Sequence, residues 1–281
     1  GDKMKPGIYA ASELSNEAYH RHDSISKTGL DLISRSPAHF FYASRREPTR
    51  AMQIGTAIHA AILEPEKFSR EYMLLRNVTD RRASEYKQAV ATWGADNVLT
   101  GTEADKVAGM QESCRNNTAA RAYFSEPYRT ELSVIATDPE TGVIVRCRFD
   151  LLTDSGRALD LKKTQDVRGS EFMRSVQNYR YHVQAAFYSD VWLWATGEPL
   201  QSFDFLAVEE NMPHPSRVFT LDDEALEIGR ALYRKDLNLY AKCLDTGEWP
   251  GIDCEPELLS LPSWAISSFE DSQEVNFEEV E

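Results

Sequence analysis

The chain has 281 residues, of which 42% are hydrophobic and 27% charged, an ordinary composition for a globular protein. Its formal net charge of −14 argues against a protein that binds nucleic acid over its whole surface. Residues 248–281 contain ten acidic residues and no Lys or Arg, which accounts for −10 of that charge and leaves room for a basic groove elsewhere.

Neither a membrane segment nor a secretion signal is visible. No run approaches the roughly 18 apolar residues that a membrane helix needs. The leading residues GDKMKPGIY lack an apolar signal region, so the sequence predicts a cytoplasmic protein that acts without a membrane. None of the four cysteines forms a C-x-x-C pair, which argues against a zinc ribbon or an iron–sulfur cluster and favours reduced thiols.

The first half of the chain is predicted to be helical. Residues 24–37 and 52–65 each have the apolar spacing of an amphipathic helix, and a proline follows or closes each segment. Residues 80–94 and 102–124 are more polar but contain few helix breakers. Helices are therefore expected to precede the first strand of the main sheet.

The pattern then changes to strands. Residues 130–138, 143–152 and 157–163 read as three strands, separated by the turn sequences PETG and TDSG. These three segments predict an antiparallel meander.

Helices and strands alternate in the last third. A helix is predicted over 178–196, strands over 201–209 and 216–221, and a long helix over 222–247. Together these elements predict an α/β fold with a central mixed sheet flanked by helices. We expect one domain over 1–265 and an acidic tail over 266–281.

Polar side chains gather on one face of the predicted meander. Because side chains alternate along a strand, Arg146, Arg148 and Asp150 share one face of the second strand. Asp160 and Lys162 share one face of the third. If the two strands pair around TDSG, we expect Asp150, Asp160 and Lys162 to converge on one polar face.

Two carboxylates and a lysine suit metal-assisted cleavage of phosphodiesters. Mg²⁺ prefers oxygen ligands and keeps several waters, and it stabilises charge that develops on a phosphate. The lysine could orient the attacking water, serve as a base if its pKa falls, or neutralise the developing charge. The alternative is a solvated strand face with cross-strand ion pairs.

The spacing Asp150…Asp160-Leu161-Lys162 resembles the PD-(D/E)xK nuclease pattern, with Phe149 where that pattern often has Pro. The segments GTAIH (55–59) and QAAFY (184–188) resemble two motifs of the RecB-type and phage recombination nucleases. More extensive stretches, in the same order from about residue 7 to 265, are similar to the RecE-type exonuclease family. They are GIYAASELSNEAYH, ISKTGL, GTAIHAAILEPEKF, DPETGVIVRCRFD, YRYHVQAAFYSD and LPSWA.

This resemblance implies a restriction-endonuclease-like core and a 5′→3′ exonuclease that depends on Mg²⁺, with Mn²⁺ as a substitute. It further implies that one strand of linear double-stranded DNA is degraded to leave 3′ single-stranded overhangs for recombination. A toroidal homotetramer and a single-strand annealing partner of the RecT type belong to the same expectation. Two alternatives are a non-catalytic DNA-binding module of a recombination complex and a PD-(D/E)xK endonuclease.

The resemblance also assigns roles to individual residues. The expected catalytic residues are Asp150, Asp160, Lys162, Gln184 and Glu131. The expected metal-contacting residues are His59, Asp150, Asp160 and Leu161. The expected contacts to DNA or to its 5′-phosphate are Arg21, Thr28, Arg148, Arg168 and Tyr188.

Each of these roles has a plainer reading. His59 could be a core histidine, Glu131 an edge-strand charge, and the arginines ordinary surface residues. The chain also departs from the family pattern, because Lys163 stands where the family usually has Thr. Since Lys163 should point to the opposite face, we do not expect it to replace Lys162.

Overall fold

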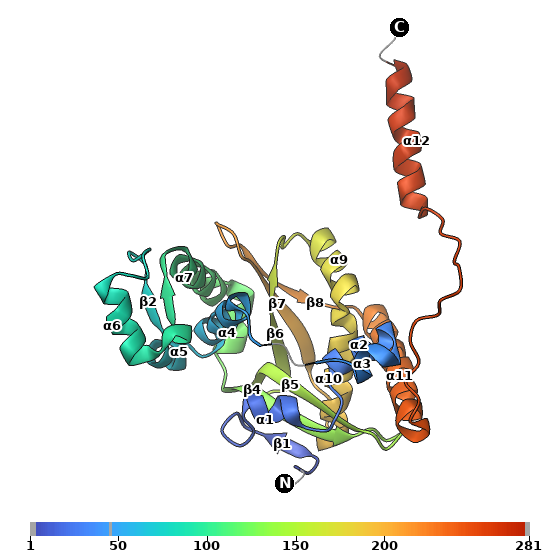
Figure 1. The fold of residues 1–281 in the computed structure, drawn as a ribbon, viewed down its shortest axis with the longest axis horizontal. Helices are drawn as coiled ribbons and strands as arrows, with labels where there is room; N and C mark the ends of the chain where they lie inside the picture. Colours follow the sequence, from blue (N-terminus) through green and yellow to red (C-terminus); the bar gives the residue numbers. More distant parts are fainter. Residues whose placement is uncertain (1–3, 45–46, 279–281) are drawn as a thin grey trace. The chain divides into compact units, whose positions relative to one another are not determined.

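The computed structural model describes residues 4–44 and 47–278 (Figure 1). Its contacts divide the chain into two compact units, Gly1–Pro250 and Gly251–Glu281. The second unit contains one helix, α12 (Ser263–Glu278), which spans the boundary that the sequence predicts at residue 265. That boundary stays a prediction, and residues 279–281 of the expected tail lie outside the described residues.

The first unit is built on a six-stranded mixed sheet, as predicted. Its strands are β1 (Gly7–Tyr9), β4 (Tyr128–Thr137), β5 (Ile144–Thr153), β6 (Arg157–Thr164), β7 (Ser202–Glu209) and β8 (Ser216–Thr220), in that spatial order. The pair β6–β7 is parallel and the other neighbours are antiparallel. The predicted meander is therefore confirmed as β4–β5–β6.

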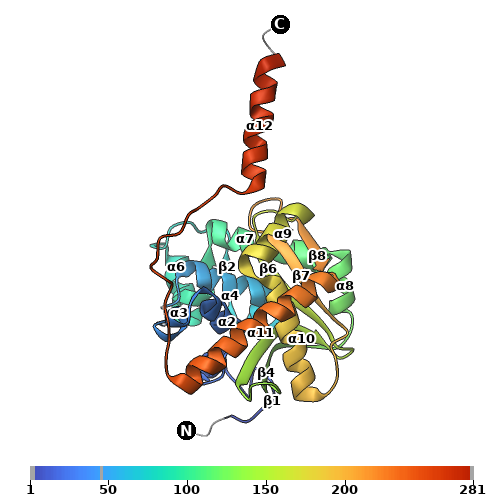
Figure 2. The ribbon, with the colours of Figure 1, turned by 90° about the vertical axis from the view of Figure 1, so that its right-hand side faces the viewer.

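Helices lie on both faces of this sheet (Figures 1 and 2). The helices of the first unit are α1 (Asn16–Arg21), α2 (Lys27–Arg35), α3 (Pro37–Phe41), α4 (Arg50–Leu63), α5 (Pro65–Glu71), α6 (Ser84–Trp93), α7 (Gly101–Asn116), α8 (Thr118–Phe124), α9 (Gly169–Tyr179), α10 (Tyr181–Thr196) and α11 (Asp223–Thr246), with a short 3₁₀ turn at Ala95–Asn97. Residues of α2, α9, α10 and α11 form one core with the sheet, and residues of α4 and α7 form a second core on its other face.

Strand alternation decides which side chains enter which core. Val145, Cys147 and Phe149 of β5 enter the core under α10, as the sequence predicts. Leu159 and Leu161 of β6 enter the core under α4. The intervening residues of β6 therefore face α10, and this places Asp160 and Lys162.

Strands β5 and β6 pair over only a short length. The last registered pair on the side of the acidic residues is Leu151↔Leu159, whereas β6 stays paired with β7 throughout. At its other end β5 bonds instead to Ile25, whose N–H donates to Ile144 O (3.1 Å) and whose carbonyl accepts from the N–H of Arg146 (2.9 Å). We call this divergence of β5 from β6, between Ile25 and the Leu151–Leu159 pair, the fork.

Several elements differ from the sequence predictions. The helix predicted over 178–196 is α10, which begins at Tyr181, and α9 before it was not predicted; Arg180, with a left-handed backbone (φ 57°), separates the two. Strand β1 precedes the helices that were expected to come before the first strand of the main sheet. The segment predicted as helical over 102–124 is divided into α7 and α8 at Asn117. The short strands β2 (Met73–Leu75) and β3 (Val98–Thr100) form a parallel pair that the sequence did not indicate. Among the helices of the described residues, none combines the length and the hydropathy that a bilayer crossing requires.

Candidate active site

Asp150 lies at the fork, where β5 and β6 separate. Its Oδ2 accepts a hydrogen bond from the N–H of Leu161 over 2.8 Å. A side chain thus takes the place of a ladder bond between the two strands. The N–H and C=O of one strand residue point to the same side, so the carbonyl of Leu161 also points toward β5, consistent with the contact predicted for it.

The predicted convergence of Asp150 and Asp160 occurs. The registered pair Leu151↔Leu159 makes Asp150 and Asp160 the next residues across from each other, which brings the two carboxylates to the same side of the antiparallel pair, as expected. Asp160 faces α10, where it accepts a hydrogen bond from Gln184. Regular alternation along β5 is interrupted at this point, because Phe149 and Leu151, two residues apart, enter different cores. The nearby Asp160 disfavours ionisation of Asp150.

Asp160, Lys162 and Gln184 form a closed network on the α10 side. Gln184 Nε2 donates to Asp160 Oδ1 (2.9 Å), and Lys162 Nζ donates to Gln184 Oε1 (2.8 Å). Lys162 Nζ also lies 2.7 Å from Asp160 Oδ2, as an ion pair without hydrogen-bond geometry. The ring of Tyr181 lies under the ammonium at 4.4 Å. The network fixes the lysine head on the carboxylate.

Lys162 keeps its proton at neutral pH. Burial alone would lower its pKa, but the carboxylates of Asp160 and Asp150 outweigh burial and raise it above the usual value. Of the three roles considered for this lysine, the base is therefore disfavoured. A fixed ammonium that orients water or neutralises charge fits the geometry.

A second cluster lies on the α4 side of the fork. One ligand atom from each of His59, Glu131 and Asp150 lies within 4.8 Å of the other two. His59 comes from α4 and has its Nδ1 3.7 Å from Asp150 Oδ2. Glu131, predicted as catalytic rather than metal-binding, belongs to this cluster, whereas Asp160 belongs to the lysine network.

Burial and like charge make this cluster reluctant to ionise. Burial, with the neighbouring Asp150, raises the pKa of Glu131 to about 7. Burial, with the neighbouring Asp160, raises the pKa of Asp150 well above its usual range. Burial lowers the pKa of His59 and favours its neutral, ligating form.

The backbone at Glu131 is unusual for a strand. Its φ is 49°, in the left-handed region that non-glycine residues rarely adopt, and it has no registered partner although both neighbours do. Strained backbone of this kind is concentrated at functional sites. The irregularity accompanies the position of the Glu131 carboxylate beside Asp150.

The donor set fits a divalent metal ion. Two carboxylates and a neutral imidazole converge, and a cation among them would offset the repulsion that raises the carboxyl pKa values. Asp160 Oδ2 has no hydrogen-bond partner among the described residues, but the Lys162 ammonium lies 2.7 Å away and compensates its charge. The case for a metal ion therefore rests on the cluster of His59, Glu131 and Asp150.

Arg148 and Tyr188, both predicted to contact DNA, are placed as supporting residues. Arg148 is buried, and its guanidinium donates to Ser133 Oγ (2.8 Å) and to Leu14 O (2.6 Å), with Glu131 at 3.7 Å. Tyr188 is half-buried against the edge of Phe149. Arg148 therefore helps to position the carboxylate of Glu131. The DNA contacts expected for Arg148 and Tyr188 stay predictions.

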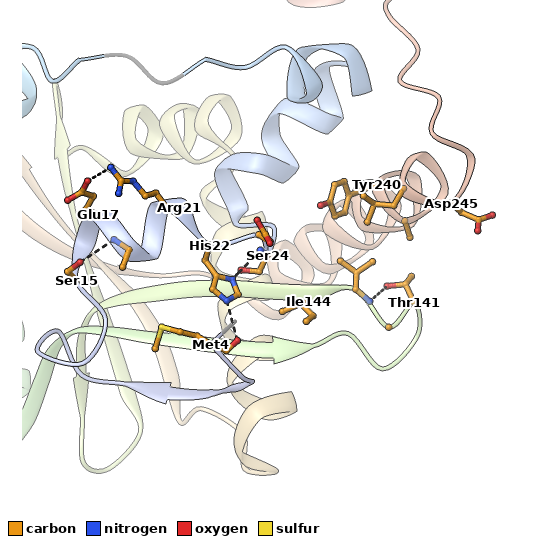
Figure 3. A pocket seen from close by; sticks show the side chains of 16 residues that line it. Met4, Ser15, Glu17, Arg21, His22, Ser24, Thr141, Ile144, Tyr240 and Asp245 are labelled. Carbon is orange, nitrogen blue, oxygen red and sulfur yellow. Dashed lines mark hydrogen bonds and ion pairs between the residues drawn. The ribbon is translucent and has the colours of Figure 1, made fainter. Parts of the chain in front are cut away.

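The other predicted phosphate contacts lie on separate elements. Arg21 is paired with Glu17 on α1 and lines a cavity of about 1060 Å³ (Figure 3). The lining of that cavity includes neither the His59–Glu131–Asp150 cluster nor Asp160 and Lys162. Arg168 is paired with Asp166 (2.6 Å) immediately before α9. Thr28 is exposed in the first turn of α2. No described contact joins these residues into one anion pocket, which therefore also stays a prediction.

The site contains residues that sequence reasoning missed. They are Ser133 and the carbonyl of Leu14, which accept hydrogen bonds from Arg148. Strand alternation could have indicated Ser133, which is opposite Arg148 in the β4–β5 register. No pattern in the sequence indicates the backbone carbonyl.

The fold resembles solved structures at low sequence identity. A Eubacterium rectale protein that carries the name "Putative exonuclease" matches with a TM-score of 0.58 and 14% identity, over 89% of this chain and 95% of that one. A phage-related exonuclease from Haemophilus somnus 129PT matches with a TM-score of 0.33 and 12% identity, over 68% and 95%. An alkaline exonuclease from Laribacter hongkongensis matches with a TM-score of 0.28 and 14% identity, over 65% and 96%.

No curated protein matches the chain. A family model does, over residues 26–257, and it is described as a PDDEXK-like domain of unknown function (DUF3799). The match includes Asp150, Asp160 and Lys162 as well as His59 and Gln184. With the sheet, the fork and the paired clusters described above, it shows that the chain belongs to this PDDEXK-like family and has the fold of the PD-(D/E)xK nuclease superfamily.

Proposed function

We propose that the protein is a metal-dependent nuclease that hydrolyses phosphodiester bonds in DNA. The observation that carries the proposal is the fork, where three carboxylates, an imidazole and a fixed ammonium meet. Restriction-type cleavage and exonucleolytic cleavage both use this combination of groups. The names of the structural relatives and the resemblance to the RecE-type family favour the exonuclease.

His59, Glu131, Asp150 and the carbonyl of Leu161 would hold the ion, and Asp160, predicted as a further ligand, would complete the set from the lysine side. A bound Mg²⁺, or Mn²⁺ in its place, would lower the pKa of a coordinated water and stabilise charge on the phosphate. Lys162, held by Asp160 and Gln184, would present its ammonium to the attacking water or to a phosphate oxygen.

The finer proposal follows the family resemblance. The enzyme would degrade one strand of linear double-stranded DNA in the 5′→3′ direction, leave 3′ overhangs, and act in the cytoplasm with a RecT-type annealing protein. A toroidal tetramer would retain the duplex during successive cleavage steps. An intact acid–lysine set favours catalysis over the non-catalytic DNA-binding module.

A comparison of linear and closed circular duplexes tests the proposal. With Mg²⁺ we expect mononucleotides from linear DNA and no change in covalently closed circles, while EDTA abolishes the reaction. Linearisation of the circles would instead indicate an endonuclease. Binding without any cleavage under Mg²⁺ or Mn²⁺ would indicate the non-catalytic module. Labels at each end of a linear duplex then give the polarity.

A further inference from the structure

Lys163 lies on the opposite side of β6 from Lys162, as strand alternation requires. Its Nζ is 3.8 Å from the position that a Cβ on Gly55 would take, so the ammonium lies on the surface of α4. Gly55 is one helical turn before His59. Lys163 therefore reaches the face of the sheet that holds the His59–Glu131–Asp150 cluster.

The charge of Lys163 is only loosely held. Its Nζ is 3.0 Å from Glu210 Oε1, in the connection between β7 and β8, and the two side chains are 33% and 27% exposed. Part-exposed ion pairs of this kind contribute little and exchange partners readily. Lys162, in contrast, is held by an ion pair with Asp160 and a hydrogen bond to Gln184.

Lys163 adds positive charge to the α4 side of the fork. In the absence of a metal ion, this side holds two carboxyl groups and a neutral imidazole, and any ionised carboxylate there repels the phosphates of DNA. The buried Arg148 is already bound to Ser133 and Leu14. Lys163 is the ammonium whose charge acts on His59 from outside the lysine network.

On the basis of the proposed function, we propose that Lys163 is a substrate-positioning residue that exchanges Glu210 for a backbone phosphate of the bound DNA strand. A charge-assisted bond to phosphate is stronger than an exposed pair with a carboxylate. The carboxylate of Glu210 then competes with the DNA phosphate for Lys163, and it pairs with the ammonium when no DNA is bound.

DNA binding without metal isolates this role from cleavage. Fluorescence anisotropy of a labelled linear duplex is measured in EDTA over a range of salt concentrations. Lys163→Ala should weaken binding on the order of tenfold and reduce the salt slope by about 0.9, the value for one lost phosphate contact. Lys163→Arg should retain both the affinity and the slope. Lys242→Ala, which removes an exposed lysine on α11, is the matched control.

A double-mutant cycle tests the competition by Glu210. Glu210→Gln should tighten binding in the wild-type background and have no effect in the Lys163→Ala background. Equal effects in both backgrounds would show that Glu210 acts on DNA by general repulsion and would overturn the exchange. Unchanged affinity and slope in Lys163→Ala would overturn the phosphate contact itself.

Folding and activity are checked separately. Thermal melting establishes that each variant folds, and Lys163→Gln, which keeps most of the side-chain stem, serves the same test if the alanine variant unfolds. The proposed function fails if the wild-type protein releases no nucleotides with Mg²⁺ or Mn²⁺. That result does not depend on the binding experiment in EDTA, so the two failures are distinguishable.

Discussion

Gln184 donates a hydrogen bond to Asp160 over 2.9 Å, and this bond joins helix α10 directly to strand β6. The same amide accepts a bond from Lys162 over 2.8 Å. An amide offers a donor at one end and an acceptor at the other, which matches a carboxylate on one side and an ammonium on the other. Gln184 is therefore a positioning residue for both.

Replacement of Gln184 by Glu should lower the rate of cleavage on the order of 10²-fold, because a second carboxylate would face Asp160 and take the lysine from it. The measurement is kcat for nucleotide release from linear duplex with Mg²⁺. Gln177→Glu, at an exposed position of α9, is the matched control. Normal turnover in Gln184→Glu would show that the amide only fills space.

The acid and the lysine of β6 are expected to be essential. Asp160→Asn and Lys162→Met keep the approximate size of each side chain but remove its charge, and each should reduce cleavage by on the order of 10²-fold or more. Lys242→Met controls for the loss of one positive charge. Circular dichroism and thermal melting confirm the fold of each variant. Near-normal Mg²⁺-dependent turnover in either variant would show that the substituted residue is not needed for catalysis.

His59→Ala should weaken metal binding, because one of three converging donors is lost. Titration calorimetry with Mn²⁺ gives the affinity, and a higher Mg²⁺ requirement in the cleavage assay should accompany its loss. His39→Ala, on α3, removes a histidine that is bonded to Ser36 instead. An unchanged affinity would identify His59 as a packing residue.

The raised pKa of Glu131 predicts a pH dependence of stability in the metal-free protein. The pKa of about 7 lets the folded state hold the proton up to about pH 7, whereas the unfolded chain releases it near the ordinary glutamate pKa of 4.5. Between these values the folded state binds more protons, so the free energy of unfolding falls as pH rises. Metal affinity should rise over the same range.

Urea unfolding in EDTA at pH 5 and pH 8 tests this prediction. Wild-type protein should lose stability relative to Glu131→Gln as the pH rises, because the amide has no charge to bury. Glu198→Gln, at an exposed position, should follow the wild type. A difference between wild type and Glu131→Gln that stays constant with pH would contradict the assigned ionisation.

The predicted phosphate pocket has a kinetic consequence. A linear duplex with a 5′-phosphate should be degraded faster than one with a 5′-hydroxyl, since a charge-assisted arginine contact is stronger than one to a neutral end. Arg168→Ala and Thr28→Val should reduce the difference, whereas Arg76→Ala, in an exposed pair with Asp105, should not. Equal rates of degradation for 5′-phosphate and 5′-hydroxyl duplexes in the wild type would show that the protein has no such phosphate pocket.

Local patterns predicted the meander, the face of each β5 residue up to Phe149, and the long helix α11. The fork was not predictable by this route. Alternation assumes continuous pairing, and divergence of β5 from β6 depends on β7 and Ile25, which are distant in the chain. Helix α9 was missed altogether, whereas the predicted start of the next helix lies within three residues of the start of α10 at Tyr181.

Site residues were predicted best where a motif fixed their spacing. Asp160, Lys162 and Gln184 were named from the sequence, and their mutual contacts are present. Lys163 was expected only to point away from Lys162. It does so, but the α4 face it reaches carries the metal-site cluster. A one-strand pattern cannot show which distant helix covers its opposite face.

The fork also bears on how the chain folds. Its borders and its functional groups come from Ile25, His59, Glu131, Asp150 and Gln184, so the contacts that complete it join distant parts of the sequence. Contacts of this kind close long loops and form late, after local helices and hairpins. An ion that recognises only the finished fork should therefore slow unfolding while leaving the rate of folding almost unchanged.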